Sequence, residues 1–349
     1  MALFDLPLDQ LETYRPEVPE PADFDEFWQR TIAEARSHDL NARLEPIDAR
    51  ATLHDTWDVT FAGFGGTDVK AWLFVPAGHE NVPVVVQFHG YSGGRGMPFP
   101  GQFVNAGWAH LVLDTRGQGW SAPSIFEVTR DASEYASGGT PGVMTSGLEH
   151  PEHYFYRRLF VDVVRLLEVA AGLPQIDRDQ IFVQGASQGG AMTIAAAGLA
   201  GLAGIPLAGA MPDVPFLCHF PRALTLTDSR PYREVGEWFA GHPDDVERSM
   251  HTLSYFDGVN LSKRATCPAL FSVALMDQIC PPSTVYAAYN QWGAQADETP
   301  ETSINVYPWN GHEGGRQVQT WEQLGWIRDR VQSRGDGPAN APRRGRHAS

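Results

Sequence analysis

Short, nearly continuous runs of apolar residues punctuate the chain from residue 82 onward. Such runs are typical of strands that are buried on both faces, as in a parallel sheet covered by helices on each side. The runs are 82–88, 109–113, 180–183 and 270–275. The segments between them are long enough for crossover helices, most clearly at 154–170 and just after residue 187. This alternation predicts an α/β fold with a mostly parallel, doubly wound sheet.

The N-terminal part of the chain follows other patterns. Residues 23–36 place apolar side chains at helical spacing and acids in the first turn, which predicts an amphipathic helix. Segments 57–61 and 69–75 flank a Gly-Phe-Gly-Gly turn, which predicts an antiparallel hairpin. Residues 1–22 are rich in proline and acid, so we expect an extended arm laid over the body.

Two internal segments interrupt the alternation of strands and helices. Residues 117–150 are rich in Gly, Ser and Thr, and loops of this length usually serve function or an interface. Residues 212–262 carry short helical pieces and several aromatics, so we expect a cap inserted between strands. Residues 334–349 lack apolar periodicity and are expected to be a disordered tail. The organisation predicted is one α/β domain over residues 1–333.

Composition narrows the classes of partner. The 349 residues carry a formal net charge of −16, which disfavours nucleic acid and anionic membrane as partners. No stretch approaches the ~20 apolar residues of a membrane span, and no basic region followed by an apolar run suggests a secretory signal. The three cysteines lack CxxC spacing, so they predict neither a disulfide framework nor a zinc site. These features favour a cytoplasmic protein.

A candidate nucleophile lies in the pentapeptide Gly185-Ala-Ser187-Gln-Gly189. The pattern Gly-x-Ser-x-Gly is the sequence form of a nucleophile elbow, a strained turn between a strand and a helix. The bare pattern is common by chance, and a glycine-rich turn with a solvated serine is the alternative. The apolar run 181–183 before it and the small residues 190–197 after it supply the strand and the helix. We therefore predict that Ser187 is a catalytic nucleophile.

A catalytic serine needs a base, and the base needs an orienting acid. Asp277 follows the apolar run 270–275, where the alternative is an N-cap aspartate. His312 comes later still, between glycines that suit a loop able to reach the serine. The order Ser, Asp, His is that of α/β-hydrolases. The expected triad is Ser187, Asp277 and His312, and this chemistry requires no metal or cofactor.

The tetrahedral intermediate needs two N–H donors. The amide after the nucleophile, that of Gln188, is one expected donor. The second is expected in the glycine-rich loop 89–94 after the first parallel strand, most simply the Tyr91 amide, unless this loop is only a strand-exit turn. Arg116 follows another strand and could either bind a substrate carboxylate or pin loops, of which we favour the structural role.

Three motifs together resemble the signature of carbohydrate esterase family seven, which contains acetyl xylan esterases and cephalosporin C deacetylases. They are Arg116-Gly-Gln118, Gly185-Ala-Ser187-Gln-Gly189 and His312-Glu313. The likeness extends to 142–145, 154–158, 213–218 and 280–284, and runs from about residue 1 to residue 330.

The resemblance implies the same triad, with the Tyr91 and Gln188 amides as the oxyanion hole. It also places Tyr91 and Pro215 at the substrate and makes Arg116, Gln118 and Glu313 structural. The implied reaction removes acetyl groups from acetylated xylo-oligosaccharides, other sugar acetates and cephalosporin C.

The resemblance further implies a homohexamer whose active sites face an inner chamber, with residues 117–150 at its interfaces. Residues 121–132 depart from the usual stretch, and the tail after residue 333 is extra. Two other hypotheses stay open. A broad short-chain carboxylesterase or peptidase would tolerate larger acyl groups. A non-catalytic binding module would escape fluorophosphonate labelling, although such proteins usually lack a triad member.

Overall fold

The computed structural model describes residues 3–136 and 142–333. The described residues form a nine-stranded sheet in the order β1-β2-β3-β5-β4-β6-β7-β8-β9. The strands from β5 through β4 to β9 pair in parallel, and β1, β2, β3 and β5 pair antiparallel in succession. The bounds are β1 Arg43–Pro46, β2 His54–Ala62, β3 Asp68–Pro76, β4 Val82–Phe88, β5 Ala109–Leu113, β6 Ile176–Ala186, β7 Gly209–Asp213, β8 Ala269–Ala274 and β9 Thr302–Tyr307. The predicted α/β fold with a mostly parallel sheet is confirmed.

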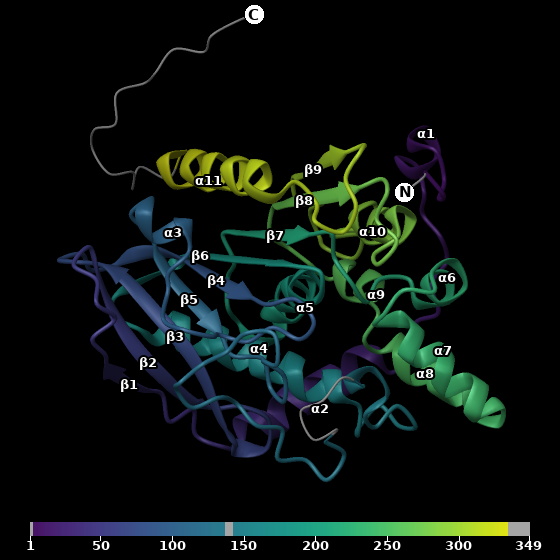
Figure 1. Cartoon of the computed structure of the whole chain (residues 1–349), viewed down its shortest axis with the longest axis horizontal. Helices are drawn as coiled ribbons and strands as arrows, with labels where there is room; N and C mark the ends of the chain where they lie inside the picture. Colours follow the sequence, from purple (N-terminus) through teal and green to yellow (C-terminus); the bar gives the residue numbers. More distant parts are fainter. Residues whose placement is uncertain (1–2, 137–141, 334–349) are drawn as a thin grey trace, which may run out of the picture.

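Helices cover both faces of the sheet (Figure 1). The long helices α2 (Phe24–Arg36), α4 (Phe155–Gly172) and α5 (Gln188–Ala203) pack together on one face, while α3 (Gln102–Asn105) and α11 (Arg316–Ser333) cover the other. Strand β4 shows why its sequence is continuously apolar. Its residues 84, 86 and 88 enter the main core, whereas Val85 enters the core under α11. Burial on both faces removes the alternation of polar and apolar residues seen in half-exposed strands.

The predicted hairpin is confirmed as β2 and β3, which pair antiparallel along their whole length. The turn between them contains the short 3₁₀ helix η1, Phe64–Gly66. Gly65 and Gly66 have φ of 62° and 71°, a region that glycine enters without steric cost. The N-terminal arm is not wholly extended, because it contains the helix α1, Leu8–Leu11. It is tied down where the Asn290 side chain donates to the Leu11 and Tyr14 carbonyls.

The segment between β7 and β8 folds into α6 (Phe220–Leu226), α7 (Tyr232–Gly241), η3 (Pro243–Asp245), α8 (Val246–Ser254) and α9 (Gly258–Ser262). Helices α7 and α8 project away from the sheet (Figure 1). Two further elements are η2 (Val143–Thr145) and α10 (Pro282–Tyr289). No helix in the ranges described is both long and apolar enough to cross a membrane. The expected tail 334–349 and part of the 117–150 segment, residues 137–141, lie outside the described residues.

Candidate active site

Ser187 occupies the sharp turn between β6 and α5, at the carboxyl edge of the sheet. Its φ of 59° and ψ of −120° are strained for a residue with a side chain, as expected of a nucleophile elbow. The two glycines of the pentapeptide make the turn possible. A Cβ on Gly185 would clash with the Gly189 backbone, and a Cβ on Gly189 would clash with the Phe88 carbonyl oxygen. The sequence pattern therefore follows from close backbone packing around the serine.

The three predicted triad residues form one continuous chain of hydrogen bonds. His312 Nε2 lies 3.0 Å from Ser187 Oγ, and His312 Nδ1 lies 2.8 Å from Asp277 Oδ2. The Asp277 side chain is fully buried, whereas that of His312 is 27% exposed. This geometry can pass the serine proton to the imidazole while the carboxylate holds the ring.

Asp277 is fixed by the turn that follows β8. Its second oxygen, Oδ1, accepts hydrogen bonds from the Ile279 and Cys280 amides at 2.8 and 2.9 Å. Pro282 opens α10 directly after this turn. The Asp277 carboxylate thus closes the turn through Oδ1 and still presents Oδ2 to the histidine.

His312 lies in a tight turn between β9 and α11. The Met276 amide donates to the Asn310 carbonyl at 3.0 Å, which joins this turn to the turn that carries the acid. A Cβ on Gly315 would overlap the Tyr307 ring, so a side chain there would displace the turn. Glu313 is exposed, and its own amide and that of Gly311 lower the pKa of its carboxyl. Its contacts are within the turn, in keeping with the structural role expected for it.

Both expected oxyanion donors have free amides beside the serine. Gln188 is the first residue of α5, where an N–H has no partner within the helix. The loop that carries Tyr91 approaches closely, since a Cβ on Gly90 would lie 3.8 Å from Ser187 Cβ. Within the described part of the chain, neither the Tyr91 amide nor the Gln188 amide donates a hydrogen bond. Both are thus available to a developing oxyanion.

The side chains of these two residues point away from the reaction and into the protein. The Tyr91 hydroxyl donates to the Glu234 carboxylate, whose oxygens lie 2.9 and 3.0 Å away, and accepts from the Gly142 amide at 3.2 Å. Burial raises the pKa of the Tyr91 phenol, so it stays a donor. Gln188 is fully buried, and its amide contacts Gln118. Sequence reasoning missed Glu234, because it lies 143 residues from Tyr91 and carries no motif.

Pro215 lies next to the nucleophile turn. Its Cα would be 2.8 Å from a Cβ on Gly190, so it packs on the first turn of α5. The adjoining Phe216 amide donates to the Ser187 carbonyl at 2.9 Å. This neighbourhood is compatible with the substrate contact expected of Pro215, which stays a prediction.

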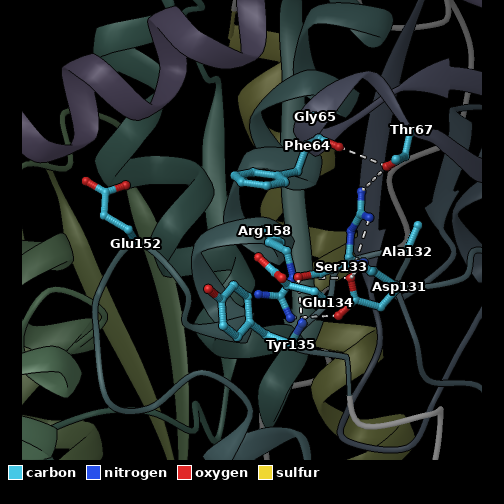
Figure 2. Close-up of a pocket in the computed structure, with 11 residues that line it drawn as sticks. Phe64, Gly65, Thr67, Asp131, Ala132, Ser133, Glu134, Tyr135, Glu152 and Arg158 are labelled. Carbon is cyan, nitrogen blue, oxygen red and sulfur yellow. Dashed lines mark hydrogen bonds and ion pairs between the residues drawn. The ribbon is translucent and has the colours of Figure 1, made fainter.

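The Arg116 side chain is buried against protein acceptors. Its guanidinium is 1% exposed and makes two bonds to Asp162, at 2.7 and 2.8 Å, and one to Thr67 at 3.0 Å. A cavity of about 390 Å³ lies alongside, and Figure 2 shows Asp131 paired with Arg158 at its wall. Because Arg116 donates to these protein acceptors, the geometry favours loop pinning over binding of a substrate carboxylate.

One group of possible metal ligands occurs among the residues described. Asp277, Cys280 and His312 each offer an atom within 4.8 Å of the others. Both ring nitrogens of His312 already contact Asp277 and Ser187. Burial raises the pKa of the Cys280 thiol well above its usual range, which disfavours the thiolate that a metal needs. The donor set therefore fits a triad better than a metal centre.

Comparison with known proteins agrees with this geometry. The model of the acetyl xylan esterase family (AXE1) matches residues 1–330. The structure is similar to an acetyl xylan esterase from Paenibacillus sp. R4, at 36% identity and a TM-score of 0.83 over 92% of this chain and 99% of that one. It is also similar to acetyl xylan esterase 1 from Thermoanaerobacterium sp. JW/SL YS485, at 31% identity and a TM-score of 0.79 over 93% and 99%.

A curated relative supports the same conclusion. An acetyl esterase of Xylanibacter ruminicola is 25% identical over 330 residues, which are 92% of this chain and 70% of that protein. The expected resemblance is confirmed. The family match and the relatives support the esterase hypothesis over the peptidase and the binding module. The chain thus belongs to the acetyl xylan esterase family and is an acetyl esterase, a carboxylic ester hydrolase of the α/β-hydrolase fold.

Proposed function

We propose that the chain removes acetyl groups from small acetylated carbohydrates through an acyl-enzyme on Ser187. The observation that carries this proposal is the unbroken chain from Ser187 Oγ through His312 to Asp277, with 3.0 and 2.8 Å between partners. The substrates proposed are acetylated xylo-oligosaccharides, other sugar acetates and the acetyl ester of cephalosporin C. Family membership supports the first two classes, and the resemblance in the motifs supports the third.

In the proposed mechanism, His312 Nε2 takes the hydroxyl proton as Ser187 Oγ attacks the acetyl carbonyl carbon. The amides of Tyr91 and Gln188 donate to the oxygen as it becomes negative. His312 returns the proton to the departing alcohol, which leaves the acetyl group on Ser187. Water, deprotonated by the same imidazole, then attacks the ester and releases acetate. Asp277 keeps the proton on Nδ1 and stabilises the imidazolium.

The test is acetate release by the full chain from a panel of esters. We expect turnover of acetylated xylo-oligosaccharides, of acetylated glucose and of cephalosporin C. A steep loss of rate is expected from p-nitrophenyl acetate to p-nitrophenyl butyrate if the acyl site is built for acetyl. Equal rates with both esters would contradict the restriction to acetyl.

The Ser187→Ala variant tests the nucleophile directly. We expect loss of turnover by roughly 10⁴-fold or more, and of fluorophosphonate labelling, with an unchanged melting temperature. The matched control is Ser249→Ala, because the Ser249 hydroxyl is buried without a partner in the described part of the chain. Wild-type activity in Ser187→Ala would overturn the assignment.

We also propose that residues 1–333 work as one catalytic domain, with 212–262 as a cap and 117–150 at interfaces between copies. The motif resemblance supports a homohexamer, and exposed apolar side chains in the second segment, Trp120 and Ile125, support an interface there. A cytoplasmic location is proposed because Cys218, Cys267 and Cys280 are all free and buried, which suits a reducing compartment.

A further inference from the structure

Two buried glutamine side chains meet beneath the proposed oxyanion hole. Gln118 Nε2 donates to Gln188 Oε1 at 2.9 Å, and Gln188 Nε2 lies 3.3 Å from Gln118 Oε1. Gln188 is the residue whose main-chain N–H is the first proposed oxyanion donor. The pair therefore joins the start of α5 to the loop that carries Gln118.

The same pair holds the loop of the second donor on both sides of Tyr91. The Ser92 amide donates to Gln118 Oε1 at 2.8 Å. On the other side, Gln188 Nε2 lies 3.4 Å from the His89 carbonyl oxygen. Ser92 has a φ of 74°, so its main chain is in a conformation that must be held by its surroundings. Each proposed donor is thus one residue or less from a contact with the glutamine pair.

The orientation of the two glutamine side-chain amides follows from the groups around them. The Ser92 N–H needs an acceptor, which fixes Oε1 of Gln118 toward it and turns Nε2 toward Gln188. Tyr156, which is fully buried, donates its hydroxyl to Gln188 Oε1 at 2.9 Å. Gln118 can both donate and accept, so its side chain accepts from the Ser92 amide and donates to Gln188 Oε1 at the same time.

Backbone hydrogen bonds and a buried ion pair hold the loop that carries Gln118. The main-chain N–H of Gln118 donates to the Thr115 carbonyl at 3.1 Å, and the main-chain N–H of the neighbouring Gly117 donates to the Thr129 carbonyl at 3.0 Å. Arg116, two residues before it, is locked by its buried pair with Asp162. The glutamine pair therefore connects the loop that carries Gln118 to both proposed donors, the Tyr91 and Gln188 amides.

We propose that Gln118 is a positioning residue that sets the separation of the Tyr91 and Gln188 amides in the oxyanion hole. This inference rests on the proposed function, because it assumes that those two amides bind the oxyanion. Gln118 touches no reacting atom. Its effect is expected in the transition state, when the carbonyl carbon becomes tetrahedral, its oxygen becomes negative and both donors must lie within hydrogen-bond distance of that oxygen.

Such a role has a kinetic signature that a general loss of packing does not produce. Loss of an interaction that is made only in the transition state lowers kcat and leaves KM little changed. We expect Gln118→Glu to lower kcat for p-nitrophenyl acetate by roughly 10- to 100-fold, less than the loss typical of a deleted donor. Glutamate keeps the acceptor for Ser92 but loses the donor to Gln188. Gln118→Leu loses both and should be the slower of the two.

A milder variant tests the same geometry from the other side. Tyr156→Phe removes only the hydroxyl that orients the Gln188 amide, so a smaller loss of kcat with unchanged KM is expected. The matched control is Gln291→Leu. Gln291 contacts the Pro16 carbonyl at 3.1 Å in the N-terminal arm, so we expect wild-type kcat.

The second readout is the affinity for phenylboronic acid, which forms a tetrahedral adduct on the serine. In Gln118→Glu and Gln118→Leu, we expect its dissociation constant to rise about as much as kcat falls. Active-site titration with a fluorophosphonate corrects every rate for the folded fraction. If Gln118→Leu does not fold, Gln118→Glu and Tyr156→Phe still carry the test.

The inference is overturned if folded Gln118→Glu and Tyr156→Phe keep kcat and the boronate affinity within about twofold of wild type. It is also overturned if KM and melting temperature change while kcat does not. Failure of the proposed function looks different, because Ser187→Ala would then retain turnover whatever the Gln118 variants do.

Discussion

The side chain of Tyr91 ties the proposed oxyanion loop to a helix far away in the sequence. Glu234 on α7 accepts from the phenol hydroxyl, and the Glu234 side chain is only 4% exposed. Burial raises the pKa of this carboxyl, while the bond from Tyr91 and the nearby Arg230 act to lower it. The Trp120 ring packs edge-on against the Tyr91 ring, with centroids 5.7 Å apart. Together with the Gly142 amide, these contacts hold the Tyr91 side chain from three segments of the chain.

Substitution of Glu234 should separate this tether from general packing. We expect Glu234→Gln to retain near-wild-type kcat, because the amide oxygen still accepts from Tyr91. Glu234→Leu leaves the buried hydroxyl without an acceptor, which should cost about 1–3 kcal/mol of unfolding free energy and lower kcat several-fold. Denaturant unfolding and kcat for p-nitrophenyl acetate give the two quantities. Equal stability of the leucine and glutamine variants would count against the tether.

For single residues, the sequence identifies the triad Ser187, Asp277 and His312, because these residue types occur in the chain order expected of such a triad. It cannot assign roles to Glu234 or Tyr156, because their partners are brought to them only by tertiary packing. The glutamine after the nucleophile is an informative residue in the sequence. Its side chain serves in the interior and not at the substrate, which only the geometry shows.

A row of polar side chains crosses four neighbouring parallel strands on the α11 side of the sheet. Each contacts the next: His110 on β5, Gln87 on β4, Gln184 on β6 and Asp213 on β7. Gln323 of α11 completes the row by donating to Asp213 Oδ2 at 2.8 Å. Asp213 Oδ1 has no hydrogen-bond partner among the described residues. The bond from Gln323 ties α11 to this row. The end of the row at Asp213 adjoins the nucleophile, since the Ser187 amide donates to the Asp213 carbonyl.

This row makes stability depend on pH through Asp213. Burial raises the pKa of its carboxyl to about 6, whereas an unfolded aspartate ionises near 3.9. Between these values the native state holds a proton that the unfolded state has lost. The stabilisation is therefore full below pH ~4 and is lost as the pH rises through about 6.

We expect Asp213→Asn to remove that pH dependence. The asparagine oxygen still accepts from Gln184 and Gln323, so the free energy of unfolding at pH 8 should rise, by at most roughly 3 kcal/mol. The contrasting variant is Asp257→Asn. Burial also raises the pKa of Asp257 to about 6, but its oxygens accept from the amides of residues 219, 220 and 259. An amide group there opposes N–H donors, so this variant should lose stability at every pH.

Elements with strong apolar patterns are predictable from the sequence, and weakly patterned ones are not. Strands β4, β5, β6 and β8 are found because burial on both faces demands apolar runs. Strand β7 is missed because it is short and contains Gly209 and Pro212. Strand β9 is half-buried throughout, and α11 buries a narrow stripe that includes Gln319 and Gln323. Polar residues on buried faces conceal such elements from pattern analysis.

The assembly of whole molecules should depend on the exposed apolar side chains of the 117–150 segment. Ile125 is 84% exposed, and the adjacent Phe126 is anchored edge-on against Trp72. An apolar side chain presented on a fixed base is suited to burial against a second copy. The proposed hexamer would bury it at an interface.

Native mass spectrometry or light scattering tests this proposal. We expect a particle of about six times the chain mass of 38.4 kDa. Ile125→Asp should reduce the assembly size, because a charge would have to be buried at the interface. Leu53→Asp is the control, as Leu53 is 78% exposed but lies outside the 117–150 segment. A monomer in the wild type, or no response to Ile125→Asp, would contradict the proposed interface.

Labelling of the three buried cysteines would measure how often the core opens. Cys218, Cys267 and Cys280 are shielded from water, and burial raises the pKa of each thiol, so the native state holds few reactive thiolates. A maleimide can then react only in states where the interior has opened, and its rate of incorporation measures how often that happens. Because Cys280 follows Asp277 by three residues, mass-resolved labelling at that position would time the opening of the active site separately from that of the rest of the core.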